Sequence, residues 1–183
     1  MTAILVLLVV AVLVGLYVVA TYNRLVGLTV RSDNAWSDID VQLKRRHDLV
    51  PNLVETVKGY AAHEKSTLDT VIQARARAMS ASGTQERAAA ENQLTHALKS
   101  LFALAEAYPQ LRAVESFTAL QSSLEEIEDA LQNARRYYNA VVRDLNTGTQ
   151  QFPSNVVANL FHIEEREFFV IDVAESARPE VRF

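Results

Sequence analysis

The sequence predicts an all-α protein, in which an N-terminal transmembrane helix precedes an antiparallel bundle of three main helices, a short fourth helix and a C-terminal tail. Residues 3–20 contain no charge and no Pro. Apolar side chains then recur at alternating spacings of three and four, the pattern of a helix with one buried face. Gly is scarce, with five in 183 residues, so few positions favour a break within these helices.

Residues 1–22 are the predicted transmembrane anchor, because about 20 apolar residues suffice for a helix to cross the hydrocarbon layer. A cleaved signal peptide is the alternative, since Val18, Val19 and Ala20 resemble a cleavage site. However, no Lys or Arg precedes the apolar run, and the run is longer than the usual apolar region of about 7–15 residues. Arg24 and Arg31 follow the span, so the positive-inside rule places the C-terminal domain in the cytoplasm.

Residues 23–32 are interpreted as a juxtamembrane connection that either bends at Gly27 or continues the membrane helix. Ser32 or Asp33 is a suitable cap for a new helix, and the apolar pattern predicts one long helix over residues 32–79. Pro51 lies inside this pattern, where a missing N–H and a clash with the preceding turn predict a kink.

The predicted bundle covers residues 33–173. A turn around Gly83 leads to a second helix over 85–107, which Tyr108-Pro109 ends. The third helix has the clearest periodicity and ends at residues 146–148; its apolar stripe comprises Phe117, Leu120, Leu124, Ile127, Leu131, Ala134, Tyr138, Val141 and Leu145. A short helix over 156–161 follows. We expect residues 167–171 to lie along the bundle and 174–183 to be loosely ordered.

Composition excludes several kinds of chemistry. The absence of Cys excludes disulfides, thiolate catalysis and Cys-based metal sites. The four His residues do not form an HExxH pattern, and no glycine-rich phosphate-binding motif is present. The net charge of −4 is too small to indicate a nucleic-acid partner. We therefore expect no catalysis, no cofactor or metal, no nucleic acid and no small-molecule substrate.

One basic cluster, Lys44-Arg45-Arg46, is the main candidate for an interaction. An acidic run in the third helix has the opposite charge: Glu125, Glu126, Glu128 and Asp129. We predict that the two pair between neighbouring helices or subunits; the alternative is that both are solvated helix faces.

The segment before Pro51 also mixes apolar and polar side chains on its inner face. Trp36, Ile39 and Leu43 alternate there with Asp40, Arg46 and His47. Polar groups in a packed seam are costly unless they are paired. Nothing in the chain clearly covers this segment, so the hypothesis is that other copies or a partner contact it.

Several long blocks resemble the LemA family. They are YNRLVGL, DNAWSDIDVQLKRRHDLVPNLVETVKGYAAHEK, LQSSLEEIEDALQNARRYYNAVVRDLN, FPSNVVANLF, REFF and the closing RPEVRF. The resemblance implies a single-pass bacterial membrane protein with a bundle of long helices, and one branch of the family is associated with magnetosome membrane formation. It supplies no catalytic residues. Gly148 and the His162–Glu165 segment depart from the family pattern.

The function predicted from these features is that of a scaffold in the cell inner membrane, which self-associates into a homo-oligomer and organises membrane or recruits partner proteins. The alternative is a regulatory adaptor that binds a membrane enzyme such as a protease. The expected partners are the lipid bilayer, further copies of the chain and a membrane protein.

Overall fold

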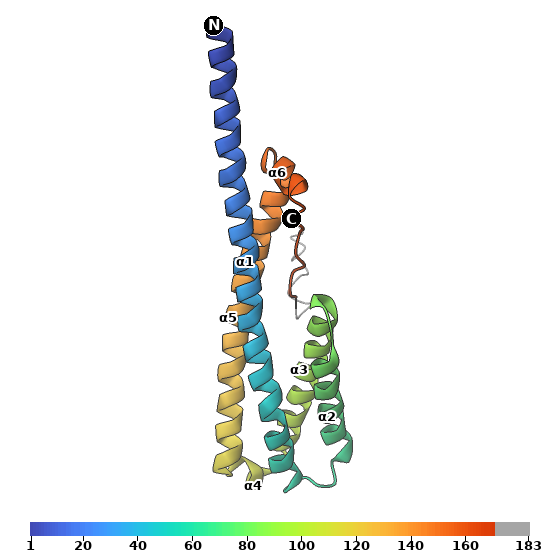
Figure 1. The fold of residues 1–183 in the computed structure, drawn as a ribbon. Helices are drawn as coiled ribbons and strands as arrows, with labels where there is room; N and C mark the ends of the chain where they lie inside the picture. Colours follow the sequence, from blue (N-terminus) through green and yellow to red (C-terminus); the bar gives the residue numbers. More distant parts are fainter. Residues whose placement is uncertain (171–183) are drawn as a thin grey trace, which may run out of the picture. The chain divides into compact units, whose positions relative to one another are not determined.

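The computed structural model confirms the all-α class. It describes residues 1–170, which contain six helices and no strand (Figure 1). The helices are α1 (Thr2–Lys58), α2 (Lys65–Ser80), α3 (Thr84–Glu106), α4 (Pro109–Arg112), α5 (Glu115–Gln150) and α6 (Ser154–Leu160). The predictions for residue 171 and for the tail over 174–183 lie outside the described residues.

The helices divide between two compact units. The first unit comprises Met1–Ser37 and Arg136–Phe168, and the second comprises Asp38–Arg135 with Phe169 and Val170. Both α1 and α5 therefore contribute one part to each unit, whereas α2, α3 and α4 belong to the second unit and α6 belongs to the first.

The single long helix predicted over 32–79 is wrong, because the chain breaks into two helices after Lys58, whereas residues 23–32 continue the membrane helix, one of the two alternatives predicted. α1 runs without interruption from Thr2 through the predicted connection and past Pro51 to Lys58. The chain then turns over residues 59–64, and α2 begins at Lys65. Pro51 sits on an exposed position, so its missing N–H leaves the buried apolar face intact; whether it kinks α1 stays a prediction.

The break after Lys58 was hidden because the apolar stripe continues across it. Val57 ends the stripe of α1, Ala61 is buried within the turn, and Leu68 resumes the stripe on α2. The N–H groups of Tyr60 and Ala61 both donate to the carbonyl of Val57, at 3.0 and 2.8 Å. These bonds satisfy a carbonyl at the C-terminal end of α1, where the chain turns. Periodicity alone does not distinguish this turn from continued helix.

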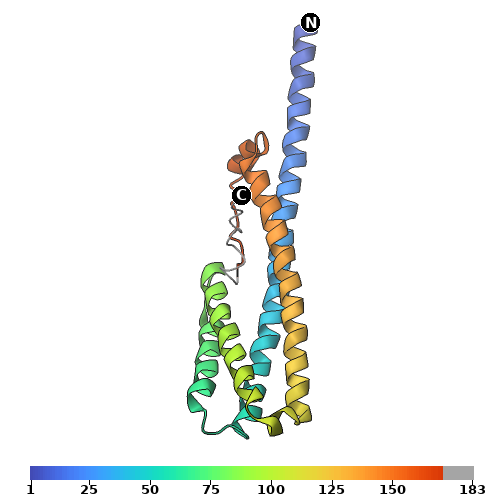
Figure 2. The same ribbon diagram turned by 180° about the vertical axis from the view of Figure 1, so that it is seen from behind.

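The second unit is held by one apolar core, to which five helices contribute. α1 supplies Leu53 and Val57, α2 supplies Val71, and α3 supplies Leu94 and Leu101. α4 supplies Leu111, and α5 supplies Phe117 and Leu124. The centroid of the Phe117 ring lies 6.2 Å from that of Phe102 on α3. Figure 2 shows α2 and α3 side by side as an antiparallel pair.

Two of the predicted boundaries are confirmed. Gly83 precedes α3 with φ of 79°, a left-handed conformation that Gly adopts without steric cost. α3 ends at Glu106 and Pro109 opens α4, as the Tyr108-Pro109 pair predicts. The apolar stripe of α5 is also buried or half-buried along its full predicted length.

The first unit packs α1 against the C-terminal part of α5 and against α6. Its core contains Leu25 and Leu28 of α1, Leu145 of α5 and Ala158 of α6. The prediction that the third helix ends at 146–148 is wrong, because α5 continues to Gln150. Gly148 therefore lies inside α5. A Cβ at this position would stand 2.8 Å from Leu25 Cδ2, so the missing side chain permits the close approach of α1 and α5.

Two helical glycines give a matched test of this packing. Gly148→Val should destabilise the protein by about 1–3 kcal/mol, because the added side chain overlaps Leu25. Gly27→Ala should instead stabilise it by about 0.5–1 kcal/mol, since no atom lies within 4 Å of the added Cβ and Ala favours the helix. Urea unfolding of the detergent-solubilised chain, followed by far-UV circular dichroism, measures both; equal effects at the two positions would contradict the close approach.

Candidate interaction site and its buried charge cluster

A buried ion pair lies in the second unit, between α1 and α3. Arg46 of α1 and Glu91 of α3 are each only 1% exposed. Arg46 Nη1 donates to Glu91 Oε2 at 3.0 Å. Its Nη2 donates to Thr95 Oγ1 at 2.7 Å and lies 2.8 Å from Glu128 Oε1 of α5. One guanidinium therefore joins three helices.

His47 completes the cluster from the next position on α1. Its Nε2 lies 2.7 Å from Glu91 Oε1. Because an ionised carboxylate only accepts hydrogen bonds, Nε2 carries the proton in this contact. Glu91 thus accepts one bond from Arg46 and one from His47, so both of its oxygens are used. Arg75 of α2 donates from Nε to the backbone carbonyl of His47 at 2.7 Å.

The geometry accounts for the cost of burying these charges. An isolated buried ion is destabilising by several kcal/mol, and only close pairing with further hydrogen bonds offsets this. Arg46 meets the requirement at both Nη atoms, because its planar fork presents several donors in fixed directions, which the single ammonium of Lys does not. Its Nε is buried without a hydrogen-bond partner. Glu128 is 44% exposed, so the outer edge of the cluster reaches solvent.

A second ion pair joins α1 to α3 nearby. Arg87 Nη1 contacts Asp40 Oδ1, and Arg87 Nε donates to the carbonyl of Ala81 at 3.3 Å. A pocket of about 330 Å³ lies beside this pair and is also lined by His47 and Glu91. Its charged groups are paired with one another, so the pocket offers a bound charge network rather than a free acid or base. Among residues 1–170, no group of three or more His, Asp or Glu is arranged to hold a metal ion.

The structure separates the members of the predicted basic cluster. Arg46 turns inward to Glu128, so this one pair forms within the chain. Lys44 and Arg45 are exposed; Lys44 Nζ bonds Asp48 Oδ2 at 2.7 Å, and Arg45 Nη1 bonds Gln42 Oε1 at 3.3 Å. The hydrogen bond from the Lys44 ammonium holds the pKa of the Asp48 carboxyl below its ordinary value of 3.8.

The remaining acidic residues of the predicted run face solvent. Glu125, Glu126 and Asp129 are exposed on α5, and the ion pairs found among the described residues do not include them. Their pairing with Lys44 or Arg45 of another copy stays a prediction.

The hypothesis that nothing in the chain covers the segment before Pro51 is wrong. Ile39 and Leu43 are buried, and the polar residues of that face, Asp40, Arg46 and His47, all have partners on α3. Sequence reasoning missed Glu91, which provides the partner. The signal was present, because Glu91 lies three residues before Leu94 on the apolar stripe of its helix.

Trp36 lies in the first unit and is half-buried. Its ring centroid is 5.3 Å from that of Tyr138 on α5, and the Tyr138 hydroxyl donates to the carbonyl of Glu167 at 2.9 Å. Asn146 also bonds the backbone N–H and carbonyl of Arg166, each at 2.9 Å. These bonds hold the segment around Glu167 along α5, as predicted.

α1 carries one stretch that is long and apolar enough to cross a membrane, and none of that stretch is buried within the described residues. The fold and this stretch define a class: a membrane-anchored helical protein whose bundle is crossed by a buried charge cluster. Within that class the chain belongs to the LemA family, since the family model matches residues 35–183.

Three curated relatives are similar to most of the chain. Magnetosome proteins MamQ 1 and MamQ 2 of Paramagnetospirillum magneticum (strain ATCC 700264 / AMB-1) are each 25% identical over 174 residues. Magnetosome protein MamQ of Magnetospirillum gryphiswaldense (strain DSM 6361 / JCM 21280 / NBRC 15271 / MSR-1) is 24% identical over the same length. Each match covers 81% of this chain and 64% of the relative, so the chain spans just under two thirds of their length.

Removing Glu91 tests the role of the cluster. Glu91→Ala leaves Arg46 buried without its main partner and should cost about 3–5 kcal/mol of stability. The double variant Arg46→Met with Glu91→Leu should be more stable than Glu91→Ala, because no unpaired charge remains between the two positions. Urea unfolding of the solubilised chain measures these differences. Glu55→Ala, at an exposed position of α1, is the control and should change stability by less than about 0.5 kcal/mol. A Glu91→Ala value in that range would contradict the argument.

Proposed function

We propose that this chain is a membrane-anchored scaffold without catalytic activity, which self-associates into a homo-oligomer and in that form organises membrane or recruits partner proteins. The observation that carries the proposal is a pair of complementary charged surfaces on the second unit. Lys44 and Arg45 are exposed on α1, and Glu125, Glu126 and Asp129 are exposed on α5. The basic surface of one copy fits the acidic surface of another.

The inward turn of Arg46 supports this assignment of the surfaces. Arg46 pairs with Glu128 within the chain, whereas Lys44, Arg45 and Glu125 make only local bonds, each within its own helix. These three side chains are exposed and so are accessible to contacts outside the chain. A basic surface that meets a different, acidic surface makes a heterologous contact, and such contacts build rings or filaments. These geometries suit a scaffold that extends along a membrane.

The charges would set orientation more than affinity. Exposed ion pairs typically contribute about 0–1 kcal/mol each, and charge complementarity chiefly selects partners and speeds encounter. Anchoring in one bilayer supplies the rest, because it confines the copies to a surface and raises their effective concentration. The names of the MamQ relatives, as magnetosome proteins, are consistent with a role at a membrane.

Charge reversal at Arg45 tests the contact. Arg45→Glu in the full chain should reduce the assembly size, measured by light scattering after size exclusion in mild detergent. The second substitution Glu126→Arg, made in the same chain, should restore it by returning an opposite pair. Arg46 is left unchanged, because its reversal would place a second negative charge beside Glu91 and unfold the cluster.

Lys99→Glu is the matched control, since Lys99 is an exposed cation on α3, a helix that carries neither surface. A wild-type assembly that Arg45→Glu leaves intact would contradict the charged contact. A wild-type chain that is monomeric at all concentrations would contradict self-association, and would favour the adaptor that binds a membrane enzyme such as a protease.

We further propose that the chain is a single-pass protein of the cell inner membrane with its C-terminal domain in the cytoplasm. Arg24 and Arg31 follow the span closely. Basic residues near the end of a span favour the cytoplasmic side.

Because the chain contains no Cys, one introduced thiol reports the orientation. Ser37→Cys should react with a membrane-impermeant maleimide only after spheroplasts are lysed. Labelling of intact spheroplasts would place the domain on the opposite side of the membrane. A thiol introduced in a periplasmic marker protein confirms that the reagent reaches the outer face.

A further inference from the structure

The end of α5 and the whole of α6 form an uncharged tip. Residues 145–163 contain no Asp, Glu, Lys or Arg, although such residues make up 22% of the chain. Asp144 precedes this stretch and Glu164 follows it. Apart from the membrane span, charged residues interrupt the rest of the chain far more often, so this stretch is unusual for a segment that faces only water.

The tip also exposes large apolar side chains. Phe152 is 83% exposed, Val156 57%, Leu160 65% and Phe161 45%. The opposite face of α6 is packed, since Val157 and Ala158 are buried. Val156 and Leu160 are four residues apart on a helix, so they share one face. A short helix with one face packed on the protein and the other both apolar and exposed is typical of a site that contacts another molecule or a membrane.

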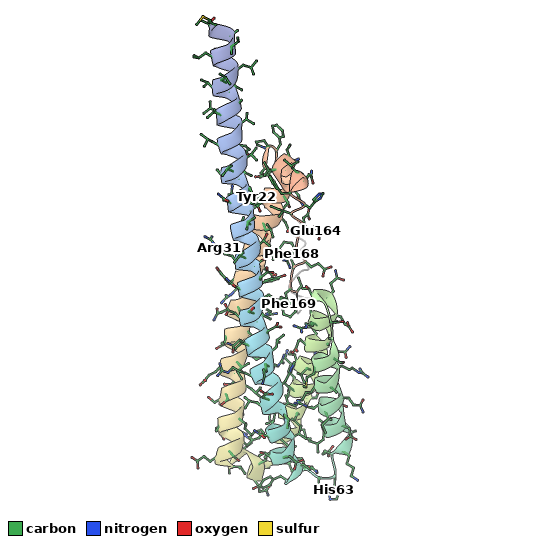
Figure 3. The ribbon with its side chains drawn as sticks, in the orientation of Figure 1. Tyr22, Arg31, His63, Glu164, Phe168 and Phe169 are labelled. Atoms are coloured by element: carbon green, nitrogen blue, oxygen red, sulfur yellow. The ribbon has the colours of Figure 1, made fainter. Side chains whose placement is uncertain are left out.

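The tip lies at the point where α1 leaves its apolar stretch. The Tyr22 ring is 4.6 Å from the ring of Phe161, which directly follows α6. Figure 3 shows Tyr22 on the part of α1 that lies beside α6. Thr21 is the first buried side chain of α1, and Leu25 and Leu28 follow it. A span of about 20 residues, roughly 30 Å, ends at this point.

We propose that the α5–α6 tip is a second membrane contact, which inserts Phe152, Val156, Leu160 and Phe161 into the interfacial layer of the bilayer that α1 spans. Aromatic side chains such as Tyr22 and Phe161 at the end of a span occupy the headgroup region. Apolar residues of an amphipathic helix bury there by about 5–10 Å. The uncharged stretch has the length and position for this contact.

The bilayer fits the surface better than a second protein does. The exposed face is continuous with the end of the membrane span, so lipid surrounds it once α1 is inserted. It carries no charged group with which a protein partner would be selected. The charged residues resume at Glu164, which lines a pocket together with Phe161 and with Tyr22 and Thr29 of α1, so charge begins at the edge of the tip.

The contact would hold the first unit to the membrane at two points. A helix anchored by one span is free to tilt and rotate, whereas a second insertion beside it limits both. This inference rests on the membrane span and not on self-association, so it can fail while the scaffold proposal stands, and the reverse also holds.

Fluorescence at a single introduced thiol tests the contact in the full chain. Leu160→Cys and Val156→Cys are each labelled with the polarity-sensitive dye NBD and reconstituted into vesicles of phosphatidylcholine and phosphatidylglycerol. Both labels should emit at shorter wavelength than a label at Ile72→Cys, which replaces a side chain of similar exposure (50%) on α2 of the second unit. Lipids brominated near the headgroup should quench the first two labels and leave the third unquenched.

Lipid quenching separates the occupants. A short-wavelength emission that brominated lipids leave unquenched means that protein covers the face, and this would overturn the membrane contact. Emission at Leu160→Cys equal to that at Ile72→Cys means that the face is in water, which would overturn it equally. Helicity by circular dichroism, unchanged from the unsubstituted chain, shows that each variant is folded.

Discussion

The second unit depends on one constraint: the guanidinium of Arg46 is buried and must be paired. Glu91 satisfies it from α3 and Glu128 from α5, while His47 occupies the remaining oxygen of Glu91. An apolar core accepts the replacement of one hydrophobic side chain by another of similar volume. A buried ion pair is more demanding, since a missing or displaced partner leaves an unpaired charge in the core. The pair therefore fixes the register of α1 against α3 in a way that apolar packing alone would not.

The same constraint explains how one short motif serves two purposes. Successive residues of a helix point about 100° apart, so Lys44, Arg45 and Arg46 cannot all face the same neighbour. Arg46 faces inward and pairs with Glu91 and Glu128 inside the fold, whereas Arg45 is exposed and accessible to a contact outside the chain. The acidic run of α5 divides in the same manner, with Glu128 toward Arg46 and the flanking carboxylates toward solvent.

Much of the fold follows from the sequence, and its failures have identifiable causes. The all-α class and the stripe of α5 depend on periodicity, which a packed helix must show. The turn after Lys58 was missed because Ala61 and Leu68 keep the stripe in phase across it. Gly148 predicted a helix end, but the close approach of Leu25 is a tertiary fact that local sequence does not show. The Arg46–Glu128 pair was predictable from charge, whereas the partnership of Arg46 with Glu91 required knowing which helix lies opposite α1.

The burial pattern along α1 supports the assignment of its environments. Before residue 20 the helix is apolar on all sides and bare, which is stable only in lipid. From Thr21 to Leu28 one face is covered by α5 and α6, and this stretch has one charged residue, Arg24, on an exposed position. Charged residues then become frequent from Arg31 onward. Cover from the chain itself thus begins where lipid cover must end. The stretch from Thr21 to Leu28, where protein and lipid cover meet, has only Arg24 as a charged residue. This is expected at the edge of a bilayer, where an unpaired charge on the inner face of the helix would be costly.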